Sequence, residues 1–217
     1  MWIGNLKNDK VWYAVYGTNL NEQRFSCYIK GGTPEGANRA DVGCHDKTMA
    51  IDGGEILIPL QLYFAKKSPR WDDKAVGFLN SKVDLTSKTL GRKYLITKDQ
   101  FNDIFKQENN IDLEEKINID FNDVIKKGTT TLKKSWYGKI ILLGEEKRVP
   151  IVTLTAYWDY KYEDVLSPSA IYLRHIIRGI NQTYKLSADQ VLEYLYQKPG
   201  LAIIFSRNKL LEVIKKS

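Results

Sequence analysis

Strand-forming and helix-forming segments alternate irregularly along the chain, and this alternation restricts the fold more than any other feature of the sequence. Runs of β-branched and aromatic residues predict strands, and the tetrapeptide 144–147 between two of them predicts a hairpin. Because there is no regular strand–helix–strand rhythm, we expect an α+β fold, with a mixed or closed sheet flanked by helices. The predicted strands are 11–16, 56–65, 74–79, 93–96, 136–143 and 148–158.

Capping residues mark the beginnings of several helices. Thr97 and Ser187 are each followed three positions later by Gln, which is the capping-box pattern. Asp120 and Gly128 predict the two ends of a short helix. The predicted helices are 21–29, one beginning at residue 97, 120–127, 168–182, one beginning at residue 187, and 208–216. We expect a single domain over 1–217, with candidate insertions at 31–54, which should be largely irregular, and at 110–134.

Composition narrows the class of protein. The net charge of +7 leaves an anionic ligand or nucleic acid open, but the basic residues are spread along the chain beside acidic ones rather than clustered. The two cysteines, Cys27 and Cys44, are expected to be reduced thiols. The first twelve residues lack the apolar run of a signal peptide, and no apolar stretch is long enough to cross a bilayer. The sequence therefore predicts a cytoplasmic protein with no membrane partner.

The helix that begins at Thr97 carries the first candidate for chemistry. Phe101, Ile104 and Phe105 form its apolar stripe, and the next position of that stripe is Glu108. A carboxyl group at the end of an apolar face should have a raised pKa, because burial disfavours its charged form. The alternative is that Glu108 belongs to a fraying last turn and points into water.

Two further segments could form a binding site. The turn 16–20 (Tyr-Gly-Thr-Asn-Leu) ends a predicted buried strand, and its backbone N–H groups could hold a carboxylate, although a purely structural turn explains the pattern equally well. Tyr172 and His175 share one face of the helix predicted after Pro168, where core packing is the default for both. Cys44-His45-Asp46 could suggest a nucleophile or a metal corner, but further ligands at metal spacing are missing, so no metal site is predicted.

Taken in order, three segments resemble the γ-glutamylcyclotransferase superfamily. The turn YGTNL at 16–20 is similar to the family's YGSNL loop, with Thr18 in place of Ser. Residues 91–108 are similar to the strand, turn and helix that end in the catalytic glutamate, although Asn109 stands where the family has Gly. Residues 168–195 are similar to the family's Pro-Ser…Tyr…Gly helix and the helix that follows it. The likeness covers roughly residues 11–195.

The resemblance implies an α+β fold whose mixed, partly closed, barrel-like sheet is flanked by helices and has a pocket at its mouth. It also implies a cofactor-free γ-glutamyl amide cyclotransferase. Glu108 would be its general base and acid, and 5-oxoproline and a free amine would be its products. Tyr16, Gly17, Thr18, Asn19 and Leu20 would bind the glutamyl carboxylate, and Tyr172 would bind the glutamyl group or Glu108. Two alternatives stay open, a non-catalytic protein of the same fold that binds a small carboxylate, and a basic nucleic-acid-associated protein. The oligomeric state is not indicated.

The acidic pair Asp72-Asp73 leads to an expectation about the departing amine. If both carboxylates face the pocket mouth, they should favour a positively charged departing group over a negative one. The alternative is that both side chains merely solvate a turn.

Overall fold

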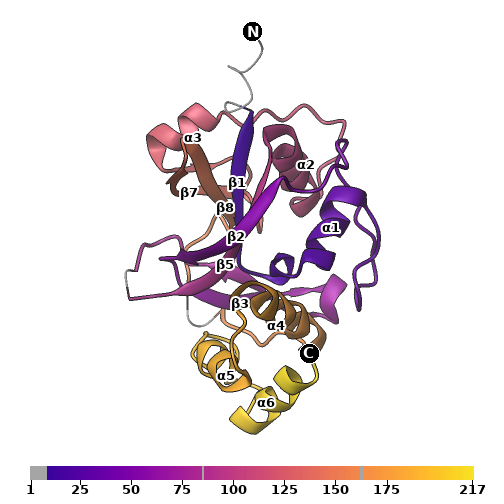
Figure 1. The fold of residues 1–217 in the computed structure, drawn as a ribbon, viewed down its shortest axis with the longest axis vertical. Helices are drawn as coiled ribbons and strands as arrows, with labels where there is room; N and C mark the ends of the chain where they lie inside the picture. The colour runs from indigo at the N-terminus through magenta and orange to yellow at the C-terminus, as the bar shows by residue number, and fades with distance from the viewer. Residues whose placement is uncertain (1–8, 85, 162–163) are drawn as a thin grey trace.

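A six-stranded mixed sheet forms the centre of the computed structural model, which describes residues 9–84, 86–161 and 164–217 (Figure 1). Its strand order is β2-β5-β1-β8-β7-β6, and each adjacent pair is antiparallel except β1 and β8, which run parallel. The strands are β1 (Lys10–Val15), β2 (Asp52–Ile58), β5 (Thr89–Thr97), β6 (Thr129–Thr131), β7 (Lys139–Glu146) and β8 (Val149–Thr155).

A separate hairpin, β3 (Leu62–Ser68) with β4 (Lys74–Leu79), partly closes the sheet. Two threonine hydroxyls connect it to the sheet. Thr155 Oγ1 accepts from the Leu79 N–H at 2.9 Å and donates to the Leu79 carbonyl at 2.8 Å. Thr89 Oγ1 accepts from the Leu62 N–H at 3.1 Å and donates to the Leu60 carbonyl at 2.6 Å. The predicted α+β fold with a partly closed mixed sheet is confirmed.

Most helices cover one face and one end of the sheet, and one short helix lies beside β6 and β7 (Figure 1). They are α1 (Glu22–Lys30), α2 (Lys98–Glu108), α3 (Phe121–Lys127), α4 (Ala170–Tyr184), α5 (Ala188–Tyr196) and α6 (Arg207–Lys215), with short 3-10 turns η1 (Thr18–Leu20) and η2 (Pro69–Trp71). The capping boxes of Thr97 and Ser187 are both formed, and Asp120 caps α3. α1 and α2 lie on the same side of β1 and β5, whereas α4, α5 and α6 gather at the lower end.

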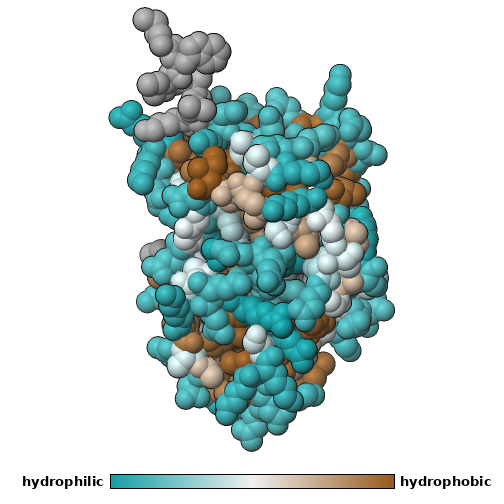
Figure 2. All heavy atoms as spheres, turned by 45° about the vertical axis from the view of Figure 1, so that its right-hand side comes forward, coloured by the Kyte–Doolittle hydropathy of each residue, from teal (hydrophilic) through white to brown (hydrophobic). Residues whose placement is uncertain are grey.

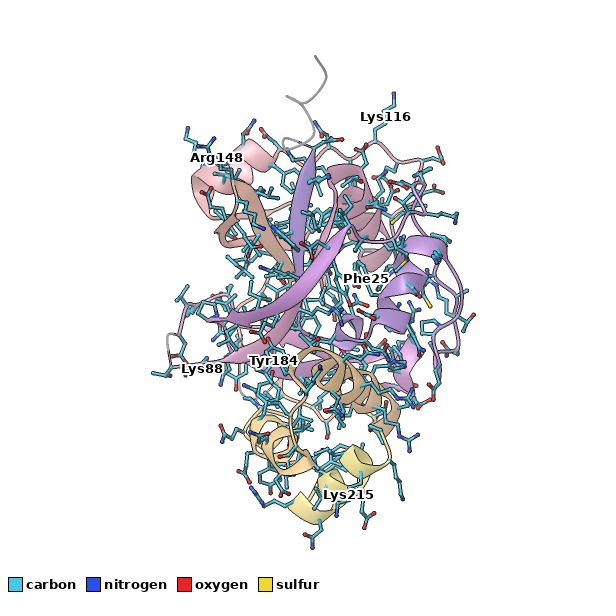
Figure 3. All side chains as sticks on the ribbon, in the orientation of Figure 1. Phe25, Lys88, Lys116, Arg148, Tyr184 and Lys215 are labelled. Atoms are coloured by element: carbon cyan, nitrogen blue, oxygen red, sulfur yellow. The ribbon has the colours of Figure 1, made fainter. Side chains whose placement is uncertain are left out.

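Aromatic side chains fill the core between α1, α2 and the sheet. Phe25 of α1 stacks on Tyr94 of β5 with 3.8 Å between ring centroids. Phe101 of α2 meets Tyr13 of β1 edge-on at 5.4 Å. Figure 3 shows Phe25 inside the molecule and Tyr184 where α4 meets the sheet. The Tyr184 hydroxyl donates to the Gly91 carbonyl at 2.7 Å. Each buried aromatic contributes about 1.5–3 kcal/mol, so this layer fixes α2, and thus Glu108, against the sheet.

Several predicted boundaries are wrong for local reasons. The strand expected at 56–65 is two strands, because Pro59 has no N–H to continue the ladder with β5. β2 begins at Asp52, inside the segment 31–54 that was expected to be irregular. α4 begins at Ala170 with Ser169 as its N-cap, so Pro168 precedes the helix instead of opening it.

One face of the molecule is mostly hydrophilic (Figure 2). Figure 2 shows teal side chains over most of the visible face, with brown patches mainly towards its upper and lower parts. Among the described residues, none of the helices combines the length and the apolar character that a membrane span requires. The N-terminal segment 1–8, on which part of the signal-peptide argument rests, lies outside the described residues.

Candidate functional site

Glu108 is the last residue of α2, and its neighbours hold that helix end in place. Phe101, Ile104 and Phe105 are fully buried, so the apolar stripe faces the core as predicted. The buried Asn109 side chain donates to the Phe105 carbonyl at 2.8 Å and to the Tyr137 carbonyl at 3.1 Å. The left-handed residue of the turn is Asn110, with φ +50°, rather than Asn109, where the resemblance would place it. The end of α2 is therefore closed by Asn109 side-chain bonds and not by a glycine.

The Glu108 side chain is half-buried, and it lines both an inner recess and a larger cavity. The Asn19 side-chain amide lies 3.3 Å from Glu108 Oε1, in position to donate. Burial raises the pKa of Glu108 above its ordinary value, and the negative charge of Asp41 adds to the rise. The Arg24 charge and a hydrogen bond from Tyr28 lower that pKa and partly offset the rise. Glu108 does not belong to a fraying last turn that points into water, because it lies beside the Asn19 side-chain amide.

A small recess of about 40 Å³ lies beside Glu108, and we call it the inner recess. Its lining includes Tyr16, Gly17, Thr18 and Asn19. Within the described residues, the N–H groups of Thr18 and Asn19 make no hydrogen bond, and the buried Asn19 Oδ1 has no partner. The Tyr94 hydroxyl donates to the Asn19 carbonyl at 3.0 Å and so fixes this turn. The residues that line the recess thus carry a carboxyl group, an unpartnered amide oxygen and two backbone N–H groups without a hydrogen bond among the described residues.

Two tyrosines separate the inner recess from a larger space. The Tyr172 hydroxyl accepts from the Gly77 N–H at 2.9 Å, and the Tyr137 hydroxyl donates to the Gly77 carbonyl at 3.1 Å. A side chain at Gly17 would meet the Tyr172 hydroxyl, because a Cβ built there lies 3.3 Å from it. Burial raises the pKa of Tyr172, so its hydroxyl stays protonated and can donate one hydrogen bond.

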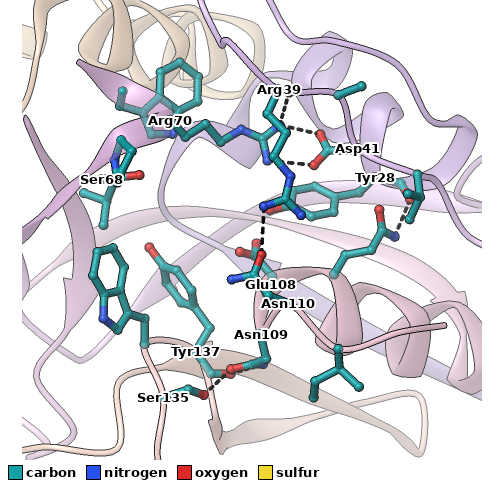
Figure 4. Close-up of a pocket in the computed structure, with 18 of the residues that line it drawn as sticks. Tyr28, Arg39, Asp41, Ser68, Arg70, Glu108, Asn109, Asn110, Ser135 and Tyr137 are labelled. Carbon is teal, nitrogen blue, oxygen red and sulfur yellow. Dashed lines mark hydrogen bonds and ion pairs between the residues drawn. The ribbon is translucent and has the colours of Figure 1, made fainter. Parts of the chain in front are cut away.

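The larger space, here called the outer cavity, has a volume of about 1090 Å³ and shares Glu108, Tyr137 and Tyr172 with the inner recess. Arg24, Arg39 and Arg70 line it together with Asp41. Figure 4 shows Arg39, Arg70 and Asp41 on one side, with Glu108 and Asn110 below Arg39.

Most of the predicted site residues converge on the inner recess. Tyr16, Gly17, Thr18, Asn19, Glu108 and Tyr172 all line it. Leu20 lies in the core, does not line the recess, and uses its N–H to donate to the Gly17 carbonyl at 3.1 Å. The Tyr16 hydroxyl donates to the Leu154 carbonyl at 2.8 Å. The first four residues of the predicted turn therefore contribute to the recess, and the fifth does not.

The acidic pair is placed differently from the expectation. Asp72 and Asp73 are exposed, both have positive φ, and neither lines the outer cavity, although the preceding Trp71 does. The expectation that they face the pocket mouth is wrong, because η2 ends in a left-handed turn that carries both residues away from it.

Arg24, Tyr28, Asp41 and Arg39 were not predicted as site residues. Arg24 and Tyr28 lie four residues apart on α1, and the Arg24 guanidinium lies 4.3 Å from the centroid of the Tyr28 ring. Their spacing on one helix face was the sequence feature that could have indicated that they lie together. Asp41 and Arg39 come from the irregular segment 31–54, which has no periodic pattern to show where its side chains point.

The Cys44-His45-Asp46 segment has a structural role. Cys44 is buried, and burial raises the pKa of its thiol to about 12. His45 lies 2.9 Å from Asp103 Oδ2 through Nδ1 and 3.1 Å from Glu114 Oε1 through Nε2, so it links α2 to the loop after it. Both cysteines are free. In the part of the chain that the structure describes, no group of three or more His, Cys, Asp or Glu could hold a metal ion.

Comparison with known proteins gives relatives in sequence and in structure. No protein-family model matches the chain. Histone deacetylase 5 of Arabidopsis thaliana is 31% identical over 207 residues, which cover 89% of this chain and 31% of that protein, so the chain spans about a third of this relative's length.

Two solved structures are similar. The crystal structure of the human uncharacterized protein loc79017 has a TM-score of 0.51 and 15% identity, with 96% of this chain and 99% of that one covered. A structure described as gamma-glutamyl cyclotransferase has a TM-score of 0.49 and 15% identity, with 96% of this chain and 100% of that one covered. The likeness to the human protein shows a shared fold.

Proposed function

We propose that this chain is a γ-glutamyl amide cyclotransferase, which releases 5-oxoproline and an amine. The observation that carries the proposal is the half-buried Glu108 carboxyl beside an inner recess lined by Thr18 and Asn19. Within the described residues, the N–H groups of Thr18 and Asn19 make no hydrogen bond and Asn19 Oδ1 has no partner. Such an arrangement matches both charged ends of an α-amino acid, an ammonium and a carboxylate. The three sequence segments that resemble the superfamily all contribute to this place.

The sizes of the two spaces fit a substrate that is only partly enclosed. The inner recess of about 40 Å³ has room for an ammonium or carboxylate head group, since a single water needs about 10–15 Å³ measured in this way. The γ-amide would then lie near Glu108, and the departing amine would extend into the outer cavity of about 1090 Å³. Tyr137 and Tyr172 would flank the boundary between the two halves.

In the proposed reaction, Glu108 accepts a proton from the substrate α-ammonium. The freed nitrogen attacks the γ-carbonyl carbon, the new C–N bond closes a five-membered lactam, and the bond to the departing nitrogen breaks. The α-nitrogen loses two protons in becoming a lactam N–H, and the departing nitrogen gains two in leaving as an ammonium, with Glu108 as the carrier. Because the attack is intramolecular, positioning supplies much of the rate. The raised pKa of Glu108 suits a group that must both accept and return a proton near neutral pH.

The test is incubation of the purified chain with γ-glutamyl amides that carry different amines, followed by measurement of 5-oxoproline. The proposal expects catalytic release from at least one of them. A chain that binds γ-glutamyl amides without releasing 5-oxoproline would instead be a carboxylate-binding protein of this fold. Salt-sensitive binding to nucleic acid without any γ-glutamyl turnover would support the third alternative.

A further inference from the structure

We infer that the outer cavity receives an anionic group on the departing half of the substrate, and that Arg39 is the residue that selects it. This inference rests on the proposed cyclotransferase function and adds the class of amine that departs. It also replaces the sequence-based expectation of a cationic departing group.

The cations of the outer cavity are not equivalent. Arg24 and Arg70 share one carboxylate, since Arg24 Nη1 lies 2.7 Å from Asp41 Oδ2 and Arg70 Nη1 lies 2.8 Å from Asp41 Oδ1. Arg70 Nη2 also donates to Asp41 Oδ2 at 2.9 Å, so this pair is bidentate. The Arg24 side chain is 3% exposed and the Asp41 side chain is 4% exposed. Arg24, Asp41 and Arg70 therefore form a closed, largely buried ion cluster.

Arg39 stands outside that cluster. Its side chain is exposed, and its guanidinium donates to the neutral side-chain oxygen of Asn110 at 3.0 Å. Its backbone carbonyl accepts from Arg70 Nη2 at 3.2 Å, so the ion cluster holds the Arg39 backbone at the cavity wall. Within the described residues, Arg39 forms no ion pair. A guanidinium with five N–H donors is thus held at the cavity with a single neutral acceptor.

The acids of the cavity do not supply the missing partner. Glu108 faces the inner recess and Asn19. Asp112, the remaining acid of the lining, is exposed and accepts the Glu114 N–H at 2.9 Å. A planar guanidinium matches a carboxylate or a phosphate in shape and charge, so an incoming anion would complete the set of Arg39 hydrogen bonds. A cation in the same place would meet Arg39 without a facing carboxylate.

The experiment compares four substrates that differ in one group. The departing amine is glycine, glycinamide, aminomethylphosphonate or ethylenediamine, each as its γ-glutamyl amide, and kcat/KM is measured for the native chain and for Arg39→Gln. The matched control is Arg148→Gln, which removes the same charge from an exposed residue at the β7–β8 turn (Figure 3). Arg148 is not among the residues that line the cavity.

The native chain should prefer the glycine compound over the glycinamide compound by about fivefold, the size expected of an exposed ion pair. Arg39→Gln should reduce that ratio to below about twofold, and Arg148→Gln should leave the ratio as it is. A phosphonate that is favoured over the carboxylate would assign the phosphate class of anion to Arg39.

An unchanged ratio in Arg39→Gln, or a native preference for the ethylenediamine compound, would overturn the inference while leaving the cyclotransferase proposal in place. If none of the four compounds released 5-oxoproline, the proposed function would fail, and this inference with it.

Discussion

Gly179 is the contact point between α4 and the turn that forms the inner recess, and replacing it by alanine should disturb both stability and activity. A Cβ at this position would lie 2.3 Å from the Leu20 carbonyl carbon and 2.5 Å from the Asn21 nitrogen. Ordinary contacts to a Cβ begin at 3.4 Å, so α4 and the turn must separate by about 1 Å. Backbone atoms cannot rotate out of the way, unlike a side chain.

The expected change in the free energy of unfolding for Gly179→Ala combines two opposing contributions. Overpacking of this kind costs about 3 kcal/mol, the upper end of its usual range, and alanine recovers about 1 kcal/mol over glycine within a helix. The net loss of about 2 kcal/mol should lower the melting temperature by about 4–8 °C for a chain of this size. A shift of about 1 Å in the turn 16–20 should lower kcat/KM for a γ-glutamyl amide by about 10²-fold.

The assay pairs thermal unfolding with kinetics, and Gly54→Ala is the control. A Cβ at Gly54 meets a single side-chain atom, Lys93 Cε, at 4.0 Å, so this change should alter stability by no more than about 0.5 kcal/mol. The reasoning is refuted if Gly179→Ala melts at or above the native temperature with unchanged kcat/KM.

Three other outcomes follow from the same site. The acid limb of kcat/KM against pH should have an apparent pKa above the ordinary Glu value of 4.5, because burial raises the pKa of Glu108. Because the pKa of Glu108 is raised on folding, its contribution to the free energy of unfolding is largest below pH 4.5 and falls as pH rises through its folded pKa. Glu108→Gln lacks this titration, so its stability relative to the native chain should increase between pH 4 and pH 8 in urea unfolding. Gly17→Val should raise KM at least about tenfold by crowding the Tyr172 hydroxyl, whereas Thr18→Ser should leave steady-state kinetics nearly unchanged.

The parts of the fold that local chemistry determines were predictable. The capping residues Thr97 and Ser187 mark their helices because an N-cap side chain satisfies nearby N–H groups without help from the rest of the fold. The division of 56–65 into two strands was missed, although Pro59 stands in the sequence, because a continuous apolar run conceals a break in pairing. The closure of the sheet by Thr89 and Thr155 depends on distant partners and has no local pattern.

The same distinction between local patterns and distant contacts applies to the residues of the site. Glu108 could be found because it continues a helical stripe, and Asn19 and Tyr172 because they belong to segments resembling a known family. Arg39 and Asp41 could not be placed, since the segment 31–54 has little regular structure and its course is set by tertiary contacts such as the Arg70–Asp41 pair. The expectation that Asp72 and Asp73 face the pocket mouth failed for a different reason, because both residues have positive φ after η2 and neither is a glycine that would have indicated such a turn.

The most direct measurement is 5-oxoproline release by Glu108→Gln under conditions where its unfolding curve shows that the variant is fully folded. Gln keeps the size of the side chain and its hydrogen bonding to Asn19 but cannot carry a proton. The account predicts a loss of at least about 10²-fold in turnover, with retained binding of 5-oxoproline in the inner recess. Native-like turnover by this variant would contradict the role of Glu108, and with it the proposed mechanism.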